Sequence, residues 1–307
     1  MRFTIYTLLL SVLFICTGKT GRTQDSTARP ESSATLEKSD TSRKTASYFE
    51  VSMNYQSNNV YLGRKDSSAL PYFIPMLSYY HKSGVYITAS AAYLKNSTAN
   101  RIDVVTLEAG YSFSAGYYSG DFTATKYFYN NQSTSVTAAI AGAVSYQNSY
   151  NFGFVKPTVT ATINFGKNTD IETAFGLEHS FYLLGDKLEI IPAFTANAST
   201  LNYYSNYYRT RRFSKRKAKK TVTGTVDITG TVVNPSEFRI LDYEPSLPIS
   251  YKTGKFTFSF TPTYTIPVNP AAIDLHYVYS TGTVADKTNT EKLGNSFFWT
   301  LGLSYRF

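Results

Sequence analysis

Apolar and polar side chains alternate with a period of two along most of this chain. The clearest segment, 156–165, reads Lys-Pro-Thr-Val-Thr-Ala-Thr-Ile-Asn-Phe, with an apolar residue at every second position. Because successive side chains of a β-strand point to opposite faces, this pattern predicts a strand with one apolar and one polar face. About twelve such segments follow Ser47, at 49–55, 70–81, 85–95, 101–113, 117–129, 136–146, 157–165, 171–181, 188–196, 241–251, 256–266 and 297–307.

The connections between these segments alternate between short turns and long loops. Most of the shortest turns follow even-numbered segments and lie near Lys82, Ala115, Gly185 and Gly254. The longest connections follow odd-numbered segments and cover 58–69, 201–235 and 269–295. Bacterial membrane barrels have short turns at one end and long loops at the other, which produces this parity. The sequence therefore predicts an all-β fold over 47–307, a transmembrane antiparallel up-and-down β-barrel of about twelve strands.

The composition argues against a helical membrane protein. Apolar residues make up 42% of the chain, yet no run beyond residue 20 approaches the ~20 apolar residues that a membrane helix needs. Tyr (27) and Phe (21) are abundant, as is typical of strands. The one cysteine, Cys16, excludes a disulfide framework. A secreted β-sandwich is the alternative fold, although its strands would have to share a single apolar core.

The N-terminus has the pattern of a secretory signal peptide over residues 1–18. A basic Arg2 precedes an apolar run over 5–15, and small residues follow it. A second candidate cleavage site lies after residue 23. A lipoprotein is disfavoured because Ile15, directly before Cys16, is larger than the residue that lipoprotein signals prefer. Residues 24–46 are polar and predict a disordered periplasmic lead-in.

The last segment has an apolar face that continues to the end of the sequence. Its members are Phe297, Trp299, Leu301, Leu303, Tyr305 and Phe307. The segment resembles the C-terminal β-signal of bacterial outer-membrane proteins, and the chain as a whole is similar to that broad class. The resemblance implies a place in the outer membrane of a Gram-negative bacterium, with both termini in the periplasm. It also implies contact with lipid and lipopolysaccharide, and recognition of the last strand by the barrel-assembly machinery.

The polar faces of the predicted strands would line a lumen and carry more acidic than basic residues. The candidate lumen-lining residues are Glu50, Glu108, Asp121, Lys156, Glu172, Glu178, Glu189, Asp242 and Glu244. Twelve strands make a barrel wider than the eight-stranded type that side chains fill, but narrower than the trimeric porins, so we expect a monomer. An excess of carboxylates in an open lumen would favour cations. The alternative is a plugged interior in which these acids pair with Lys and Arg.

A dense basic cluster lies in the long connection 201–235, close to Tyr203 and Tyr204. Its members are Arg209, Arg211, Arg212, Lys215, Arg216, Lys217, Lys219 and Lys220. By the parity of the connections this loop is extracellular, where it could bind lipopolysaccharide phosphates or another polyanion. The alternative is a solvated charged loop without a ligand.

Residues that could support catalysis are scarce. His179 and Ser180 are adjacent, so on a strand they point to opposite faces, and His276 falls in the predicted loop 269–295. We therefore expect no enzymatic activity, no cofactor and no metal site. The predicted function is a narrow passive channel for small solutes with weak cation preference. The alternative is a non-conducting barrel whose loops 201–235 and 269–295 bind a surface polyanion or a protein partner.

Overall fold

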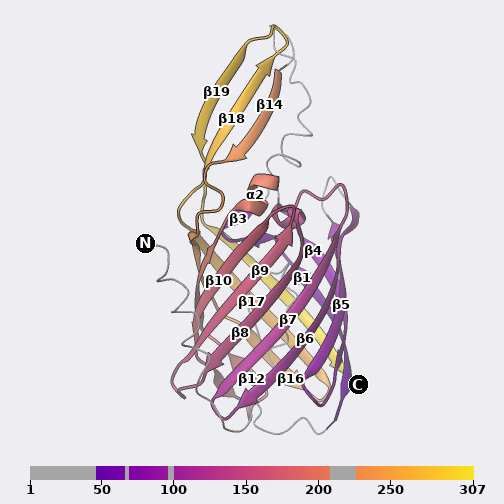
Figure 1. Cartoon of the computed structure of the whole chain (residues 1–307). Coiled ribbons are helices and arrows are strands. Elements are labelled where there is room, and N and C mark those ends of the chain that lie inside the picture. Colours follow the sequence, from indigo (N-terminus) through magenta and orange to yellow (C-terminus); the bar gives the residue numbers. More distant parts are fainter. Residues whose placement is uncertain (1–45, 66–68, 96–99, 208–225) are drawn as a thin grey trace.

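Twelve antiparallel strands follow one another around a closed barrel in the part of the chain that the structure describes (Figure 1). The structure is a computed structural model, and it describes residues 46–65, 69–95, 100–207 and 226–307. Strand β20 closes the barrel by pairing with both β17 and β1. The barrel strands are β1 (Tyr48–Gln56), β4 (Tyr72–Tyr80), β5 (Val85–Lys95), β6 (Asn100–Ala115), β7 (Tyr118–Tyr129), β8 (Ile140–Tyr150), β9 (Lys156–Gly166), β10 (Thr169–Glu178), β13 (Ala193–Ser199), β15 (Arg239–Ser246), β17 (Phe256–Pro267) and β20 (Ser296–Arg306).

This architecture confirms the predicted fold class. Each predicted segment overlaps one barrel strand, and the long loops gather at one end of the barrel, as the parity requires. The exceptions are the connections of β5 to β6 and of β9 to β10, which are short although they lie at the end that carries the long loops. We call the two ends the short-turn end and the long-loop end. The start of β1 and the end of β20 both lie at the short-turn end, since Glu50 pairs with Arg306.

Three prolines interrupt the hydrogen-bond ladder along one line across the barrel wall. Each accepts a single bond from the neighbouring strand: His179 N to Pro192 O (3.3 Å), Ile191 N to Pro248 O (2.8 Å) and Leu247 N to Pro262 O (3.1 Å). Residues paired in this way normally exchange two bonds, but proline has no N–H to return. The short strands β11 (Phe181–Leu183), β12 (Leu188–Ile190) and β16 (Ile249–Thr253) continue the wall beyond this line toward the short-turn end.

The two faces of the wall differ as the alternation predicts. Many outward side chains are large, apolar and exposed, among them Phe49, Leu77, Leu107, Phe122, Val144, Ile163, Phe175, Phe258 and Leu301. Inward side chains are mostly Ser, Thr, Asn and acidic residues. A closed barrel satisfies its backbone hydrogen bonds between strands, and an apolar exterior matches hydrocarbon. The wall therefore has the construction of a membrane-spanning barrel.

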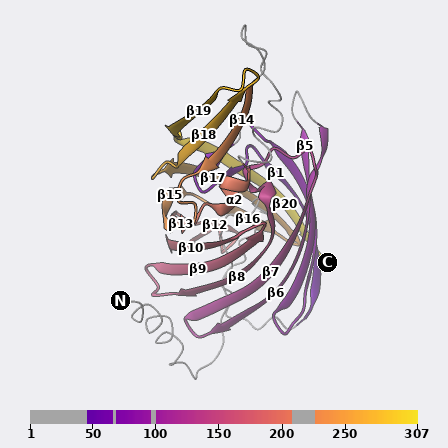
Figure 2. The ribbon, with the colours of Figure 1, turned by 45° about the horizontal axis from the view of Figure 1, so that its top comes forward.

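Connecting segments fill the long-loop end of the barrel. The loop after β1 forms a hairpin of β2 (Val60–Tyr61) and β3 (Arg64–Lys65), the loop after β7 holds the 3₁₀ helix η1 (Val136–Ala139), and the loop after β13 begins with α2 (Asn202–Tyr207). Figure 2 shows α2 within the mouth of the barrel. We call the hairpin, η1 and α2 together the plug. Among the described residues, no helix is long and apolar enough to cross a membrane.

A three-stranded sheet, which we call the outer sheet, stands beyond the long-loop end (Figure 1). It consists of β14 (Val226–Val232), β18 (Ala272–Tyr279) and β19 (Val284–Thr290). The prediction of a loop over 269–295 is therefore incomplete. His276 lies on β18 rather than in a loop, and its Nδ1 is 2.6 Å from Oδ1 of Asp286. Strands form here because β18 pairs with β14, which comes from the other long connection.

Gly110 on β6 marks a tightly packed place on the inner wall. A Cβ at this position would lie 2.3 Å from Cζ of Tyr86. We expect Gly110→Ala to lower the free energy of unfolding by about 1–3 kcal/mol, a typical cost of overpacking. Urea unfolding of the barrel in lipid vesicles measures this change. Gly176→Ala is the matched control, because its Cβ would meet nothing nearer than 3.6 Å. Equal unfolding midpoints for the two variants would contradict the packing around Tyr86.

Candidate functional site

At the level of the plug, every barrel strand presents a buried side chain to the lumen. These residues, one from each strand and each exposed by 9% or less, are Gln56, Tyr72, Leu94, Val104, Tyr127, Ile140, Asn164, Glu172, Ser199, Asp242, Thr265 and Ser296. They form a ring around the inner wall, and the plug lies inside that ring. The lumen is therefore closed at this level.

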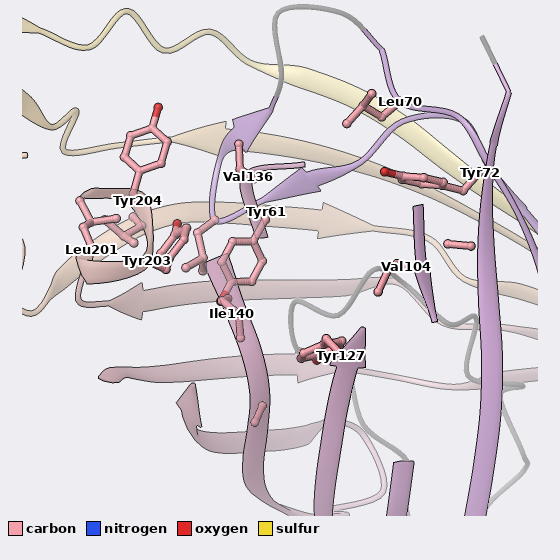
Figure 3. Packing of buried hydrophobic residues seen from close by; sticks show 14 of the residues in the cluster. Tyr61, Leu70, Tyr72, Val104, Tyr127, Val136, Ile140, Leu201, Tyr203 and Tyr204 are labelled. Atoms are coloured by element: carbon pink, nitrogen blue, oxygen red, sulfur yellow. The ribbon is translucent and has the colours of Figure 1, made fainter. Parts of the chain in front are cut away.

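An apolar cluster occupies the centre of the closed level (Figure 3). Tyr61 and Leu62 from the hairpin, Val136 from η1, and Leu201 and Tyr203 beside and within α2 belong to it. The barrel wall contributes Tyr72, Ile74, Ala92, Leu94, Val104, Tyr127, Ile140, Ala143 and Leu241. The rings of Tyr61 and Tyr203 meet edge to face, with centroids 5.1 Å apart. Because burial of apolar surface contributes about 25 cal/mol per Å², the hydrophobic effect helps to seat the plug.

Tyr61 also ties the hairpin to the wall through a buried polar contact. Its hydroxyl donates to Oε2 of Glu172 (2.8 Å), and Nδ2 of Asn164 donates to the same oxygen (3.0 Å). Burial raises the pKa of the Tyr61 hydroxyl well above its ordinary value, and the neighbouring Glu172 carboxylate raises that pKa further. The hydroxyl therefore stays protonated, and remains a donor, throughout the physiological pH range.

Asp170, near the start of β10, holds α2 against the wall. Its Oδ1 accepts bonds from Thr200 Oγ1 (2.7 Å) and Asn202 N (2.6 Å), and its Oδ2 accepts one from Tyr203 N (2.8 Å). The first N–H groups of a helix have no partner within the helix, so an acceptor beside them fixes its position. Asp170 is thus a positioning residue for the plug.

Arg64, on β3, is the charged centre of the plug. Its side chain is 1% exposed, and Nη2 lies 3.1 Å from Oε2 of Glu291, which directly follows the last strand of the outer sheet. Nη1 donates to the carbonyl of Leu62 (2.9 Å), and the guanidinium lies 5.1 Å from the centroid of the Tyr204 ring. A buried charge is costly unless it is paired, and the Glu291 carboxylate, together with the nearby buried carboxylate of Asp242, supplies the countercharge that the hairpin needs.

Nearer the short-turn end, the part of the lumen wall formed by β9 to β17 is partly accessible to solvent. Partly exposed inward side chains include Thr158, Glu178, Thr195, Glu244, Ser246, Ser259 and Thr261, on β9, β10, β13, β15 and β17. Lys156 and Glu178 form an ion pair between β9 and β10. Glu244 accepts a bond from Thr265 Oγ1 (3.0 Å). We call this region, lined by β9 to β17, the accessible face of the lumen.

Three of the candidate lumen acids line the wall across from the accessible face. Glu50 on β1 and Glu108 on β6 point inward, and each is 9% exposed. Asp121 on β7 is 4% exposed. Its Oδ1 accepts bonds from Thr123 Oγ1 (2.6 Å) and Tyr86 OH (2.9 Å), so hydroxyl groups rather than a cation satisfy this carboxylate.

The remaining candidate acids divide between the two levels of the lumen. Glu172 and Asp242 belong to the closed level, where Asp242 accepts a bond from Asn197 Nδ2 (2.8 Å). Glu189 lies on β12, beside Tyr182 and nearer the short-turn end. Within the described ranges, no three His, Cys, Asp or Glu side chains are placed to hold a metal ion.

The structure brings part of the predicted polyanion-binding loop into the plug. Tyr203 and Tyr204, which the sequence places beside the basic cluster, are buried in α2. The basic cluster itself, at 209–220, lies outside the described residues. The two tyrosines therefore stabilise the closed level of the lumen.

The residues of the C-terminal segment lie on the outward face of β20. Phe297, Leu301, Leu303 and Phe307 are exposed. The Trp299 ring packs between β1 and β17, with its centroid 5.2 Å from that of Tyr55 and 6.0 Å from that of Phe260. The Tyr305 and Phe256 centroids are 4.8 Å apart. These contacts place the segment at the closing seam of the barrel.

The sequence did not identify four residues that hold the plug: Tyr61, Arg64, Asp170 and Glu291. Their contacts join positions far apart in the chain, since Tyr61 meets Glu172 and Arg64 meets Glu291. One sequence feature could have indicated that this connection is buried: the run Val-Tyr-Leu at 60–62 is apolar within a mostly polar connection.

Comparison with known proteins assigns the chain to no family. No family model matches it, and no curated protein matches it. Solved structures that match include a bacterial polysaccharide outer membrane secretin, at 9% identity and a TM-score of 0.39 over 85% of this chain and 98% of that one. The outer membrane channel DcaP of Acinetobacter baumannii matches at 11% identity and 0.32 over 86% and 98%. A porin matches at 10% and 0.28 over 85% and 99%.

These likenesses are too distant to carry an argument about the site. The assignment to the broad class of outer-membrane β-barrels rests on the closed barrel and its apolar exterior, which confirm it at the level of the fold.

Proposed function

We propose that this protein is a passive outer-membrane channel for small solutes, closed at its long-loop end by the plug and weakly selective for cations when open. The observation that carries the proposal is the division of the lumen. Nearer the short-turn end, the wall from β9 to β17 is polar and partly accessible, whereas the long-loop end is filled by connecting segments. Because the plug includes no barrel strand, it can move without breaking the wall.

The proposed location and orientation follow from the same construction. A closed barrel with an apolar exterior suits a bilayer, and residues 1–18 have the pattern of a secretory signal. Short turns face the periplasm in bacterial barrels, so we place both ends of the barrel there and the plug outside. In this orientation β20 is available to the barrel-assembly machinery, and the outward side chains contact lipid and lipopolysaccharide. We propose a monomer.

The proposed cation preference rests on the charges of the accessible face. Glu178 and Glu244 are acidic, and Lys156 is the basic residue paired with Glu178. Rings of carboxylates favour cations in aqueous pores, whereas amines favour anions. On the opposite wall, Glu108 is a further inward carboxylate, whereas the inward Glu50 lies opposite Arg306 in the strand register.

This preference can be tested on a barrel from which the hairpin has been removed by replacing residues 58–70 with an Asn-Gly turn, called here the hairpin-less barrel. Under a tenfold KCl gradient in a planar bilayer, we expect a reversal potential on the cation side, below the limit of about 59 mV for a perfectly selective pore. Glu178→Gln should shift the reversal potential toward anion selectivity, because Lys156 is left without its partner. Lys156→Gln should shift the reversal potential further toward cation selectivity.

The control for this test is Glu237→Gln, since Glu237 is an exposed carboxylate outside the lumen. It should leave the reversal potential unchanged. An anion-selective pore, or equal shifts in one direction for Glu178→Gln and Lys156→Gln, would contradict the proposed selectivity. A folded hairpin-less barrel that carries no current would overturn the channel itself.

The second candidate function is a non-conducting barrel whose connections 201–235 and 269–295 bind a surface polyanion or a protein. The closed level of the lumen and the outer sheet favour it. A hairpin-less barrel without current would support this function and direct attention to the basic cluster at 209–220.

A further inference from the structure

We infer that the outer sheet controls the plug through one buried carboxylate, that of Glu291, so that displacement of the sheet opens the lumen. The inference rests on the proposed channel function and concerns its regulation. It starts from the position of Glu291, which directly follows β19 at the foot of the outer sheet.

The Glu291 carboxylate joins three separate segments. Its Oε1 accepts a bond from the hydroxyl of Tyr204 in α2. Its Oε2 accepts one from Ala271 N (3.2 Å), the residue just before β18, and lies 3.1 Å from Nη2 of Arg64 in the hairpin. One side chain therefore contacts the foot of the outer sheet and two of the three parts of the plug.

The hairpin depends on this carboxylate because Arg64 is fully buried. The Glu291 side chain is only 6% exposed, so solvent screens the ion pair weakly. Glu291 is in direct contact with Arg64, and the buried carboxylate of Asp242 also interacts with this guanidinium. Loss of the Glu291 charge leaves the buried guanidinium under-compensated, which favours a conformation that rehydrates it. For Arg64, rehydration means withdrawal of β3, and with it Tyr61, from the mouth of the barrel.

The foot of the outer sheet is packed into the same apolar cluster as the plug. Val232 of β14 and Ile273 of β18 are each 5% exposed, and Ala271 is fully buried. The backbone N–H of Glu291 donates to the carbonyl of Ala271 (2.8 Å), which fixes the carboxylate relative to β18. The foot of the outer sheet is therefore not a flexible joint, and a tilt of the sheet would carry Glu291 away from Arg64.

The turn of the hairpin is tightly packed against the end of β17. We therefore expect the hairpin to switch between discrete positions rather than to move through a continuous range. Gly63 has a φ of +73°, and a Cβ there would lie 2.6 Å from Cβ of Pro267 at the end of β17. Packed contacts of this kind tend to switch between discrete arrangements rather than deform continuously.

Single-channel recording of intact and variant barrels tests the inference. Glu291→Gln keeps the shape of the side chain and removes its charge, and we expect it to raise the open fraction of the channel roughly tenfold. Glu237→Gln, which neutralises an exposed carboxylate at the same end of the barrel, is the matched control and should have no effect. Heat-modifiable migration in a gel verifies that each barrel is folded.

A second variant tests the part played by the outer sheet. Replacing 275–288 with a short turn removes most of β18 and β19 but keeps Ala271, Ile273 and Glu291. This truncation should raise the open fraction in the intact barrel and add nothing in the Glu291→Gln background, because both act through one contact. Independent, additive effects would overturn the coupling.

The outcomes separate this inference from the proposed function. If the hairpin-less barrel conducts while Glu291→Gln leaves the open fraction unchanged, the channel stands and control through Glu291 is wrong. If the hairpin-less barrel is folded and carries no current, the channel is wrong. If Glu291→Gln and the truncation open the intact barrel without additivity, both are supported.

Discussion

The hairpin-less barrel is expected to conduct in long, discrete steps, whereas the intact barrel should open rarely and briefly. The replacement is structurally mild, because Gln56 and Tyr72 are directly paired and a two-residue turn can join their strands. It removes Tyr61, Leu62 and Arg64 from the lumen and leaves every barrel strand in place. If the plug favours the closed state by about 2 kcal/mol, its removal raises the mean current roughly thirtyfold.

Two point variants test whether the mean current depends on the contacts of the plug. Tyr61→Ala removes the ring that packs on Tyr203 and the bond to Glu172, so it should raise the open fraction, although less than removal of the whole hairpin. Phe154→Ser alters an exposed turn residue at the opposite end of the barrel and should leave gating unchanged. The expected order of mean current is hairpin-less barrel, Tyr61→Ala, then Phe154→Ser together with the intact chain. Equal currents from all four would contradict the role of the plug.

The barrel itself was predictable from the sequence because its determinants are local. The side-chain alternation of a strand repeats every two residues, so a segment such as 156–165 reveals its two faces without knowledge of its neighbours. Prolines, which cannot donate a backbone hydrogen bond, also indicate from the sequence where the ladder between strands is interrupted. Pro192 falls in the gap between β12 and β13, and Pro262 accepts a ladder bond that it cannot return.

The plug was not predictable because its contacts are long-range. Tyr61 and Glu172 are 111 positions apart, and no local period links them. A weaker signal is present at the long-loop ends of several strands, where neighbouring residues are both apolar, as at Val104 and Val105. On a strand one of the two must point inward, and Val104 does so, packing in the apolar cluster. Consecutive apolar pairs at one end of a barrel are thus a sign that loops fold into the lumen.

The outer sheet was missed for a different reason. The parity of the connections requires a long loop over 269–295, and length alone does not distinguish a loop from a hairpin. The alternation of Ile273, Leu275 and Tyr277 with polar residues was nevertheless visible, and in the structure it forms the face of β18 opposite His276. Its partner β14 lies in the other long connection, so the pairing could not be inferred from either loop by itself.

Cysteine accessibility along the lumen tests most directly whether one half is open to water and the other is closed. The barrel from Ser47 onward contains no cysteine, because the one cysteine of the sequence is Cys16. Ser259 and Thr265 both point inward from β17, but Ser259 is partly exposed on the accessible face and Thr265 is fully buried at the closed level. Ser259→Cys and Thr265→Cys therefore probe two depths on one strand.

With a charged, water-soluble thiol reagent, we expect Ser259→Cys to react rapidly in the folded barrel. Thr265→Cys should react about 100-fold more slowly, if exposing it requires a local opening that costs about 3 kcal/mol. In the hairpin-less barrel the two rates should become similar. Equal rates in the intact barrel would mean that the plug does not close the lumen. Failure of both cysteines to react in either barrel would mean that the lumen holds no aqueous path, and would contradict the channel.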